Sequence, residues 1–240
     1  MDTLTLVLSS ASSLVTALLV AFFLVIRITK KPVYGLVAKI LPSLGFVLMG
    51  VLAIVTRSLD LPFGAAFIIM GLVFGLVGDI VLDLKRAHSE FENLYLKTGM
   101  ISFIVGHFFF LAAFVLVGIN HQIDLLLPML VPVAIALILA PITVIVSKKV
   151  IKANFGKFKI LSASYAGLLI YVTISTLWLA ILDVAFLIPA IGMILFLFSD
   201  LVLSQMYFVD GKAENKALVI INHSTYYAAQ ILLAVSLFLF

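Results

Sequence analysis

Long apolar stretches separated by short polar ones run through all 240 residues of the chain. A helix that spans a membrane needs about 20 mostly apolar residues. Eight stretches reach this length, and they cover roughly residues 4–28, 33–56, 62–84, 97–118, 123–147, 160–182, 184–208 and 216–240. Because no polar stretch is long enough to form an aqueous domain, the pattern predicts an all-α polytopic membrane helix bundle. We expect one transmembrane domain over residues 1–240.

Two of the predicted helices carry an aspartate inside an apolar run. Asp79 lies in the sequence GLVFGLVGDIVLDL, and Asp200 lies in the sequence GMILFLFSDLVL. A carboxylate at the centre of a membrane helix costs about 2.5–3.5 kcal/mol on insertion scales, so it normally faces the bundle interior and indicates function. Gly71 and Gly75 share a helix face with Asp79 and would let another helix approach there. We therefore expect both aspartates to face protein.

The two aspartate-bearing stretches are also similar to each other. When they are aligned on their first glycines, Asp79 falls on Asp200, and the valine and leucine that follow coincide as well. A duplication would give two parallel four-helix halves, residues 1–120 and 121–240, related by an axis along the membrane normal. The alternative is chance similarity between apolar runs, and the sequence leaves both open.

Composition agrees with a membrane protein and narrows the chemistry. Hydrophobic residues make up 65% of the chain, whereas soluble domains are about 45–50% apolar. The chain has no cysteine, which excludes disulfides and thiolate catalysis. Its net charge of +4 comes from residues in loops. We therefore expect membrane lipids and no nucleic acid as partners.

The basic residues predict the orientation of the bundle. All lysines and arginines except Lys39 and Arg57 fall in or near connections at one end of the predicted helices. Connections rich in lysine and arginine stay on the cytoplasmic side. We expect the protein to lie in the plasma (inner) membrane. Both of its termini would then lie on the outer side.

This orientation places several polar residues at one depth. At 1.5 Å per residue, Asp79 and Asp200 lie roughly 8–12 Å from the cytoplasmic helix ends. Five further polar residues lie roughly 10–20 Å from that side, namely Lys39, His107, Tyr226, Tyr227 and Gln230. The sequence therefore predicts a site in the cytoplasmic half of the membrane.

Two carboxyl groups in one low-dielectric site indicate acid–base chemistry. They cannot both ionise easily, so one can act as an acid while the other acts as a base. The alternative is that Asp79 and Asp200 each pair separately with a structural partner. Lys39 could hold a carboxylate ionised, meet a phosphate or snorkel to the interface. We expect Asp83, beside Lys85 and Arg86, to form an interfacial ion pair.

The histidines and tyrosines allow more than one interpretation. His107 and His223 could join the aspartates as zinc ligands, but their spacing favours structural hydrogen bonds. Tyr226, Tyr227 and Gln230 form a polar stripe that could orient a carboxyl group or only join helices.

The chain resembles the YhhN-like lysoplasmalogenase family. The resemblance rests on four blocks in order, GLVFGLVGDIVL, GMISFIVGH, FLFSDLVL and YYAAQ. It implies that Asp79 and Asp200 are the catalytic residues. The residues that we expect to bind substrate are Lys39, His107, Ser199, Tyr226, Tyr227 and Gln230. Lys31, which precedes a proline, is the alternative to Lys39 as the lysine of the family.

The resemblance also implies an activity and a substrate. It implies hydrolysis of the vinyl ether bond of a lysophospholipid, a lysoplasmalogen. The products are a fatty aldehyde and glycerophosphoethanolamine or glycerophosphocholine. This chemistry needs a protonated carboxylic acid and a carboxylate, and we expect no metal and no cofactor. The alternatives are a proton- or cation-coupled transporter and a zinc-dependent membrane lipid hydrolase.

Overall fold

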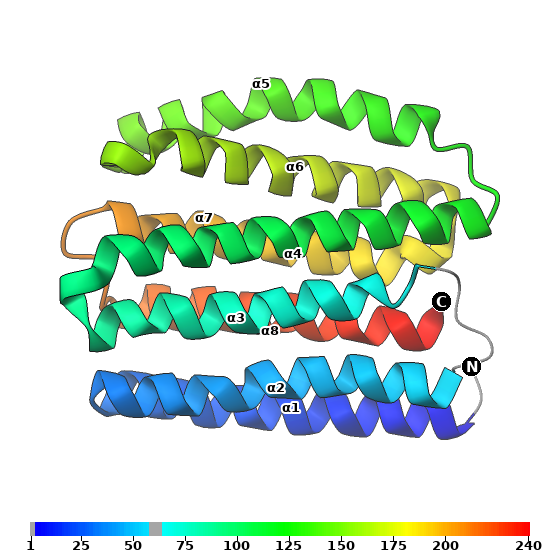
Figure 1. The fold of residues 1–240 in the computed structure, drawn as a ribbon, viewed down its shortest axis with the longest axis horizontal. Helices are drawn as coiled ribbons and strands as arrows, with labels where there is room; N and C mark the ends of the chain where they lie inside the picture. The colour runs from blue at the N-terminus through cyan, green and yellow to red at the C-terminus, as the bar shows by residue number, and fades with distance from the viewer. Residues whose placement is uncertain (1–2, 58–63) are drawn as a thin grey trace.

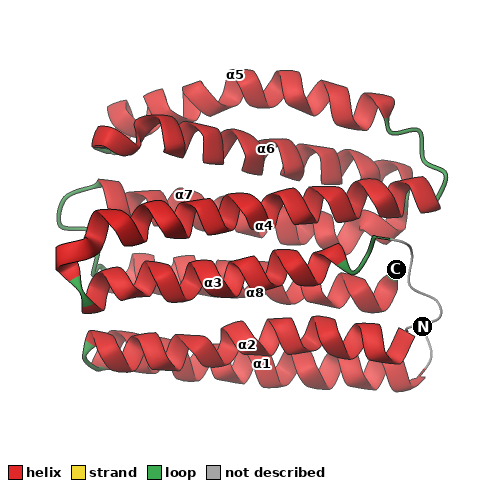
Figure 2. Cartoon of the chain, in the orientation of Figure 1, coloured by secondary structure: helices red, strands yellow, loops and turns green. Residues whose placement is uncertain are grey.

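The computed structural model describes residues 3–57 and 64–240, and every regular element in these ranges is a helix (Figure 2). The long helices are α1 (Thr3–Thr29), α2 (Pro32–Arg57), α3 (Phe67–Ala87), α4 (Glu92–Asn120), α5 (Leu126–Val150), α6 (Lys159–Leu182), α7 (Leu187–Phe208) and α8 (Lys216–Leu239). Short 3₁₀ helices precede three of them: η1 (Ser89–Phe91), η2 (Gly156–Phe158) and η3 (Val184–Phe186).

Within the described residues, 8 helices are long and apolar enough to cross a membrane. In hydrocarbon every backbone N–H and C=O must bond within the protein, and a helix satisfies this condition within its own segment. The predicted all-α polytopic bundle is therefore confirmed. The helix predicted from residue 62 begins at Phe67, and residues 62 and 63 lie outside the described ranges.

The helices lie side by side along the long axis of the molecule (Figure 1). In this view the pair α5 and α6 lies at one edge, α1 and α2 lie at the other, and the remaining four helices lie between them. The buried aromatic core includes Phe46, Phe110, Phe196 and Tyr227, which come from α2, α4, α7 and α8. Helix α5 packs mainly on α6 and contributes less to this core.

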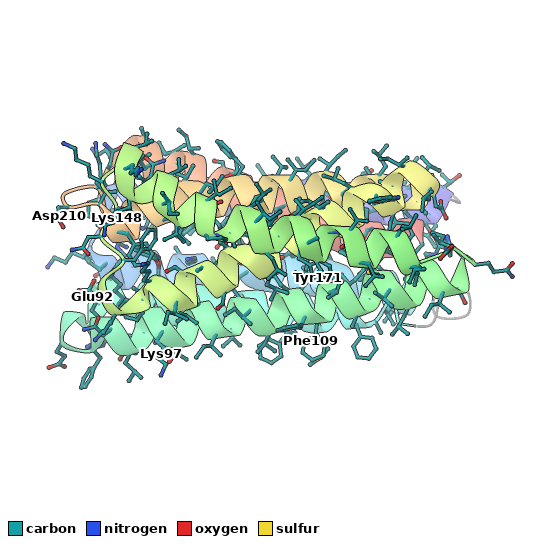
Figure 3. All side chains as sticks on the ribbon, turned by 90° about the horizontal axis from the view of Figure 1, so that it is seen from above. Glu92, Lys97, Phe109, Lys148, Tyr171 and Asp210 are labelled. Carbon is teal, nitrogen blue, oxygen red and sulfur yellow. The ribbon has the colours of Figure 1, made fainter. Side chains whose placement is uncertain are left out.

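One end of the bundle carries most of the lysines and arginines, because they lie in or beside the connections at that end. Both termini lie at one end (Figure 1). Lys97, Lys148, Glu92 and Asp210 lie at the opposite end, whereas Phe109 and Tyr171 lie near the middle (Figure 3). We call the end that carries the α1–α2, α3–α4, α5–α6 and α7–α8 connections the basic end.

The helix neighbours in the two halves largely correspond. In the first half α1 packs on α2, α2 on α3 and α3 on α4, and the same order recurs from α5 to α8. Helix α2 also contacts α8, as the corresponding α6 contacts α4. The contact between α1 and α8 has no counterpart of similar extent between α5 and α4. The duplication itself remains a prediction.

Glycines let α3 approach two neighbours at once. A Cβ on Gly71 would lie 2.4 Å from Phe110 Cε1 of α4, and a Cβ on Gly75 would lie 2.4 Å from Gln230 Nε2 of α8. The close approach predicted from these glycines is present. It involves a different partner helix at each glycine.

We predict that Gly71→Ala destabilises the bundle, because its methyl group would meet the rigid Phe110 ring. Overpacking of this kind typically costs about 1–3 kcal/mol, which should appear as a lower melting temperature of the purified protein. Gly167→Ala is the matched control, since a Cβ there meets only Ala140 Cβ at 3.3 Å. Equal melting temperatures for the two variants would contradict this account of the α3–α4 contact.

Candidate functional site

The Asp79 carboxyl group is buried and has partners from two neighbouring helices. Lys39 Nζ of α2 lies 3.2 Å from its Oδ1. Its Oδ2 accepts hydrogen bonds from Ser43 Oγ at 2.7 Å and from the Tyr226 hydroxyl at 2.9 Å. Lys39 and Ser43 are four residues apart on α2, so they reach the same side of that helix. Both carboxyl oxygens of Asp79 are therefore satisfied by one cation and two neutral donors.

Lys39 is the centre of a buried charge cluster. It is 5% exposed, and its Nζ also lies 3.5 Å from Asp83 Oδ1. The alternative that Lys39 snorkels to the interface is therefore wrong, because its ammonium group lies beside two carboxylates. Lys31, the alternative family lysine, is exposed and precedes α2.

Asp83 forms the expected ion pair, but the pair is with Lys39 and is buried, so the expected interfacial position is wrong. Asp83 is 3% exposed, and its Oδ2 has no hydrogen-bond partner among the described residues. Its charged neighbours along the chain pair elsewhere, Lys85 with Glu92 and Arg86 with Glu214. Asp83 lies one helical turn after Asp79, and this position brings it to the same lysine.

A layer of residues behind Asp79 holds its partners in place. The Tyr227 hydroxyl lies 3.1 Å from Ser43 Oγ and donates to the Lys39 carbonyl oxygen at 3.4 Å. Gln230 Nε2 donates to the Tyr226 hydroxyl at 2.9 Å. The missing Cβ of Gly75 makes room for Gln230. Tyr227 and Gln230 thus contact the groups that bind Asp79.

Asp200 has a simpler environment. Its Oδ2 accepts a hydrogen bond from the hydroxyl of Tyr165 on α6. Among the described residues it has no ion-pair partner, and no hydrogen bond joins it to Asp79. Asp200 is half-buried, whereas Asp79 is 2% exposed.

Both aspartates nevertheless line one cavity of about 50 Å³. Its wall also includes Ser199, Asn222 and Tyr226. Asn222 Nδ2 donates to the carbonyl oxygen and to the hydroxyl of Ser199, at 2.9 and 3.0 Å, and so joins α8 to α7. A polar space of this size can hold a few water molecules. We call it the polar chamber.

An apolar groove of about 450 Å³ adjoins the polar chamber. Its lining comes mainly from α4, α5, α6 and α7, and along α6 it extends from Ser162 to Leu177, about 22 Å at 1.5 Å per residue. The exposed side chains of Leu139 and Ile194 border it, so it opens toward the surrounding membrane. Asp200 lines both the groove and the chamber.

A wider cavity of about 720 Å³ lies at the basic end. It shares Arg27, Arg86, Tyr207 and Glu214 with the polar chamber. We call it the vestibule. Vestibule, chamber and groove therefore form a series of adjacent spaces, with the two aspartates in the middle space.

The eight predicted site residues divide into three groups. Five of them line the polar chamber, namely Lys39, Asp79, Ser199, Asp200 and Tyr226. Tyr227 and Gln230 lie behind Asp79, as described above. The remaining one, His107, packs its ring 4.6 Å from Phe196 and 5.7 Å from Tyr165, measured between ring centroids.

The two histidines proposed as zinc ligands point to different neighbours. Each Nδ1 lies close to a carbonyl oxygen of its own helix, at 2.7 Å for His107 and 2.8 Å for His223. His223 packs on Phe23, away from the aromatic neighbours of His107. In the part of the chain that is described, no group of three or more His, Cys, Asp or Glu residues could hold a metal ion.

Three polar residues that form hydrogen bonds to predicted site residues were not themselves predicted. Ser43 and Asn222 each lie one turn from a predicted residue, four residues after Lys39 and four before Tyr226, so helical spacing was an available signal. Tyr165 gave no such signal, because α6 carries no predicted site residue.

Comparison with known proteins identifies a family for this architecture. No curated protein and no solved structure matches the chain. The model of the YhhN family matches residues 8–237, which include both aspartates and nearly the whole of the bundle. The chain therefore belongs to the YhhN family, the family of lysoplasmalogenases.

Proposed function

We propose that the protein hydrolyses the vinyl ether bond of a lysoplasmalogen, releasing a fatty aldehyde and glycerophosphoethanolamine or glycerophosphocholine. The observation that carries this proposal is that Asp79 and Asp200 line one polar chamber and that Asp200 also lines the adjoining apolar groove. A lysoplasmalogen is likewise polar at one end and apolar at the other. It has a polar head group and one hydrocarbon chain, with the vinyl ether between them. Membership of the YhhN family supports the same activity.

The three spaces suggest how the substrate lies. The hydrocarbon chain would enter the apolar groove, which opens toward lipid and removes apolar surface from water. The head group would lie toward the vestibule, and the vinyl ether would then reach Asp200, which lines both groove and chamber. This placement requires no movement of the lipid chain through polar space.

We assign the acid role to Asp200 and the base role to Asp79. Asp79 contacts an ammonium group and two hydroxyl donors, which are the contacts that suit a carboxylate. Asp200 has a phenol as its partner and borders the apolar groove, where a neutral carboxylic acid is less costly than an ion. Different surroundings for two carboxyl groups are a common basis for acid–base catalysis.

In the first half of the proposed reaction, Asp200 donates its proton to the alkene carbon that is not bonded to oxygen. The double bond supplies the electron pair, and an oxocarbenium ion forms. The Asp79 carboxylate stabilises this cation and takes a proton from a water molecule in the chamber. The water oxygen bonds to the oxocarbenium carbon and gives a hemiacetal.

In the second half, the hemiacetal hydroxyl returns a proton to the Asp200 carboxylate. The carbon–oxygen bond to glycerol breaks, and Asp79 gives its proton to the departing glycerol oxygen. The products are the aldehyde and the glycerophospho alcohol, and one water molecule is consumed. Both aspartates end in the protonation states in which they began.

We predict that Asp79→Asn and Asp200→Asn each lower lysoplasmalogen turnover at least about 100-fold, because general acid–base groups typically contribute 10²–10⁴-fold. Asp83→Asn is the matched control, since Asp83 is a third buried aspartate and contacts Lys39 but plays no part in the mechanism. It should keep most of the activity. Turnover by purified protein in detergent measures all three, with chromatography confirming that each variant is folded.

Near-normal turnover in either of the first two variants would contradict the two-carboxylate mechanism. Proton or cation flux in proteoliposomes without any lipid turnover would favour the transporter instead.

We also predict that a chelator leaves the activity unchanged, because the proposed acid and base are both carboxyl groups of the chain. The measurement is turnover by purified protein before and after treatment with a strong zinc chelator, with a known zinc hydrolase as the positive control. Loss of turnover that added zinc restores would make His107 and His223 the first residues to test as ligands.

We further propose that the basic end faces the cytoplasm, as the positive-inside rule expects. Because the chain has no cysteine, single cysteines can report on the two ends. Val184, which is 77% exposed at the end with the termini, and Lys212, at the basic end, are suitable positions. In intact cells a membrane-impermeant maleimide should label Val184→Cys and spare Lys212→Cys, and both should react after permeabilisation. The reverse labelling would show the opposite orientation.

A further inference from the structure

Two arginines converge on one carboxylate between the vestibule and the polar chamber. Arg27 and Arg86 lie in the last turns of α1 and α3, and Glu214 lies in the α7–α8 connection. Arg27 Nη1 lies 2.9 Å from Glu214 Oε2. Arg86 donates from Nε to Oε1 at 3.0 Å and from Nη2 to Oε2 at 3.2 Å. Arg86 therefore binds the carboxylate through two parallel hydrogen bonds, and Arg27 adds a third.

The exposure of the three side chains is unequal. The side chain of Arg27 is 3% exposed and that of Arg86 is 14% exposed, whereas that of Glu214 is 62% exposed. Two guanidinium groups without an anion would be costly to keep buried. The anion in this structure is the exposed member of the cluster, on a loop that projects from the basic end (Figure 1).

Glu214 leaves some of the arginine donors unused. Arg27 Nε and Arg86 Nη1 are buried and have no hydrogen-bond partner among the described residues. A phosphodiester has two charged oxygens and further ester oxygens, and guanidinium forks recognise phosphate and carboxylate with the same geometry. Gly35 of α2 lets both arginines lie against that helix, since a Cβ there would lie 3.3 Å from Arg86 Nη1 and 3.5 Å from Arg27 Cδ.

The cluster also lies where the proposed substrate needs an anion site. Arg27, Arg86 and Glu214 line both the vestibule and the chamber that contains the two aspartates. Of the other cations of the chamber, Lys39 is already engaged by Asp79 and Asp83, and Lys85 by Glu92. The arginines are therefore the better candidates for contact with a phosphate.

We propose that Arg27 and Arg86 bind the phosphodiester of a single-chain glycerophospholipid, and that the Glu214 carboxylate occupies this site until the phosphodiester displaces it. The identity of the ligand rests on the proposed function. A tethered competitor lowers the apparent affinity by the fraction of time that it fills the site. Glu214 thereby keeps the arginines paired when no lipid is bound, and it opposes the entry of molecules that cannot replace its charge.

Glu214 carries the charge that this role requires. Partial burial raises the pKa of its carboxyl group, but the hydrogen bonds and positive charges of Arg27 and Arg86 outweigh burial and lower the pKa below its usual value of 4.5. Glu214 is therefore anionic at neutral pH.

The test compares variants at the two sides of this contact. The probe is 1-acyl lysophosphatidylcholine, which has the phosphodiester but no vinyl ether, and the measurement is the ligand-dependent melting temperature of purified protein. Glu214→Gln should tighten apparent binding about tenfold and Arg86→Gln should weaken it about tenfold, the size expected for one charge-assisted contact. Asp183→Asn is the matched control, because it breaks the His121–Asp183 pair, whose residues line none of the three spaces, and it should change nothing.

Two further ligands distinguish the source of the anion. Monoacylglycerol, which lacks the phosphate, should bind all four proteins alike. Inorganic phosphate should bind wild-type protein far more weakly than the lysolipid, and equal binding of the two would overturn the lipid assignment. Weaker lysolipid binding in both Glu214→Gln and Arg86→Gln would mean a purely structural clamp and would also overturn the proposal. If Arg86→Gln does not fold, Arg86→Lys replaces it, with weaker binding expected because the fork is lost.

A measurement of turnover tests the same proposal, and it depends on the proposed function. With a lysoplasmalogen, Arg86→Gln should raise KM about tenfold with little change in kcat, since a phosphate contact contributes alike to ground and transition states. With an alkenylglycerol that lacks the phosphate, the same variant should match wild type. If no vinyl ether is cleaved at all, the proposed function fails, and the binding measurements still decide whether the arginines hold a phospholipid.

Discussion

The structure depends on the rule that a charge buried in a membrane must be paired. Lys39 lies among hydrophobic helices, and two carboxylates within 3.5 Å compensate its charge. The cost of leaving any member alone is high, because the low dielectric that strengthens the pair also penalises an unpaired ion. This requirement holds α2 and α3 in register with each other, and the hydroxyls of Ser43 and Tyr226 then complete the surroundings of Asp79.

Corresponding helices of the two halves support the two aspartates differently. Helix α2 supplies a cation and a serine to Asp79, whereas the corresponding α6 supplies only the tyrosine hydroxyl of Tyr165 to Asp200. Similar helix positions thus produce two unequal carboxyl groups. For the proposed reaction this inequality is essential, because one group must give a proton while the other receives one.

The position of α5 explains why one side of the site is open to lipid. This helix packs mainly on α6 and leaves a groove between α4, α5, α6 and α7 that Asp200 lines. At the other side of the chamber, charged residues from α1, α3 and the α7–α8 connection converge at the basic end. A molecule with one hydrocarbon chain and an anionic head group matches this sequence of surfaces, and the chemistry lies where the two meet.

The sequence by itself determined the eight-helix architecture and singled out Asp79 and Asp200. Hydrocarbon accepts only apolar segments of a fixed length, so the helices can be read from the pattern, and an aspartate in such a segment is conspicuous. Only the tertiary structure decided how the charges pair: Lys39 turns inward to Asp79 and Asp83, Tyr165 binds Asp200, and Arg27 meets Arg86 across Glu214. These partners come from helices or loops distant in sequence. Periodicity shows which face of a helix is polar, but it carries no information about which other helix that face meets.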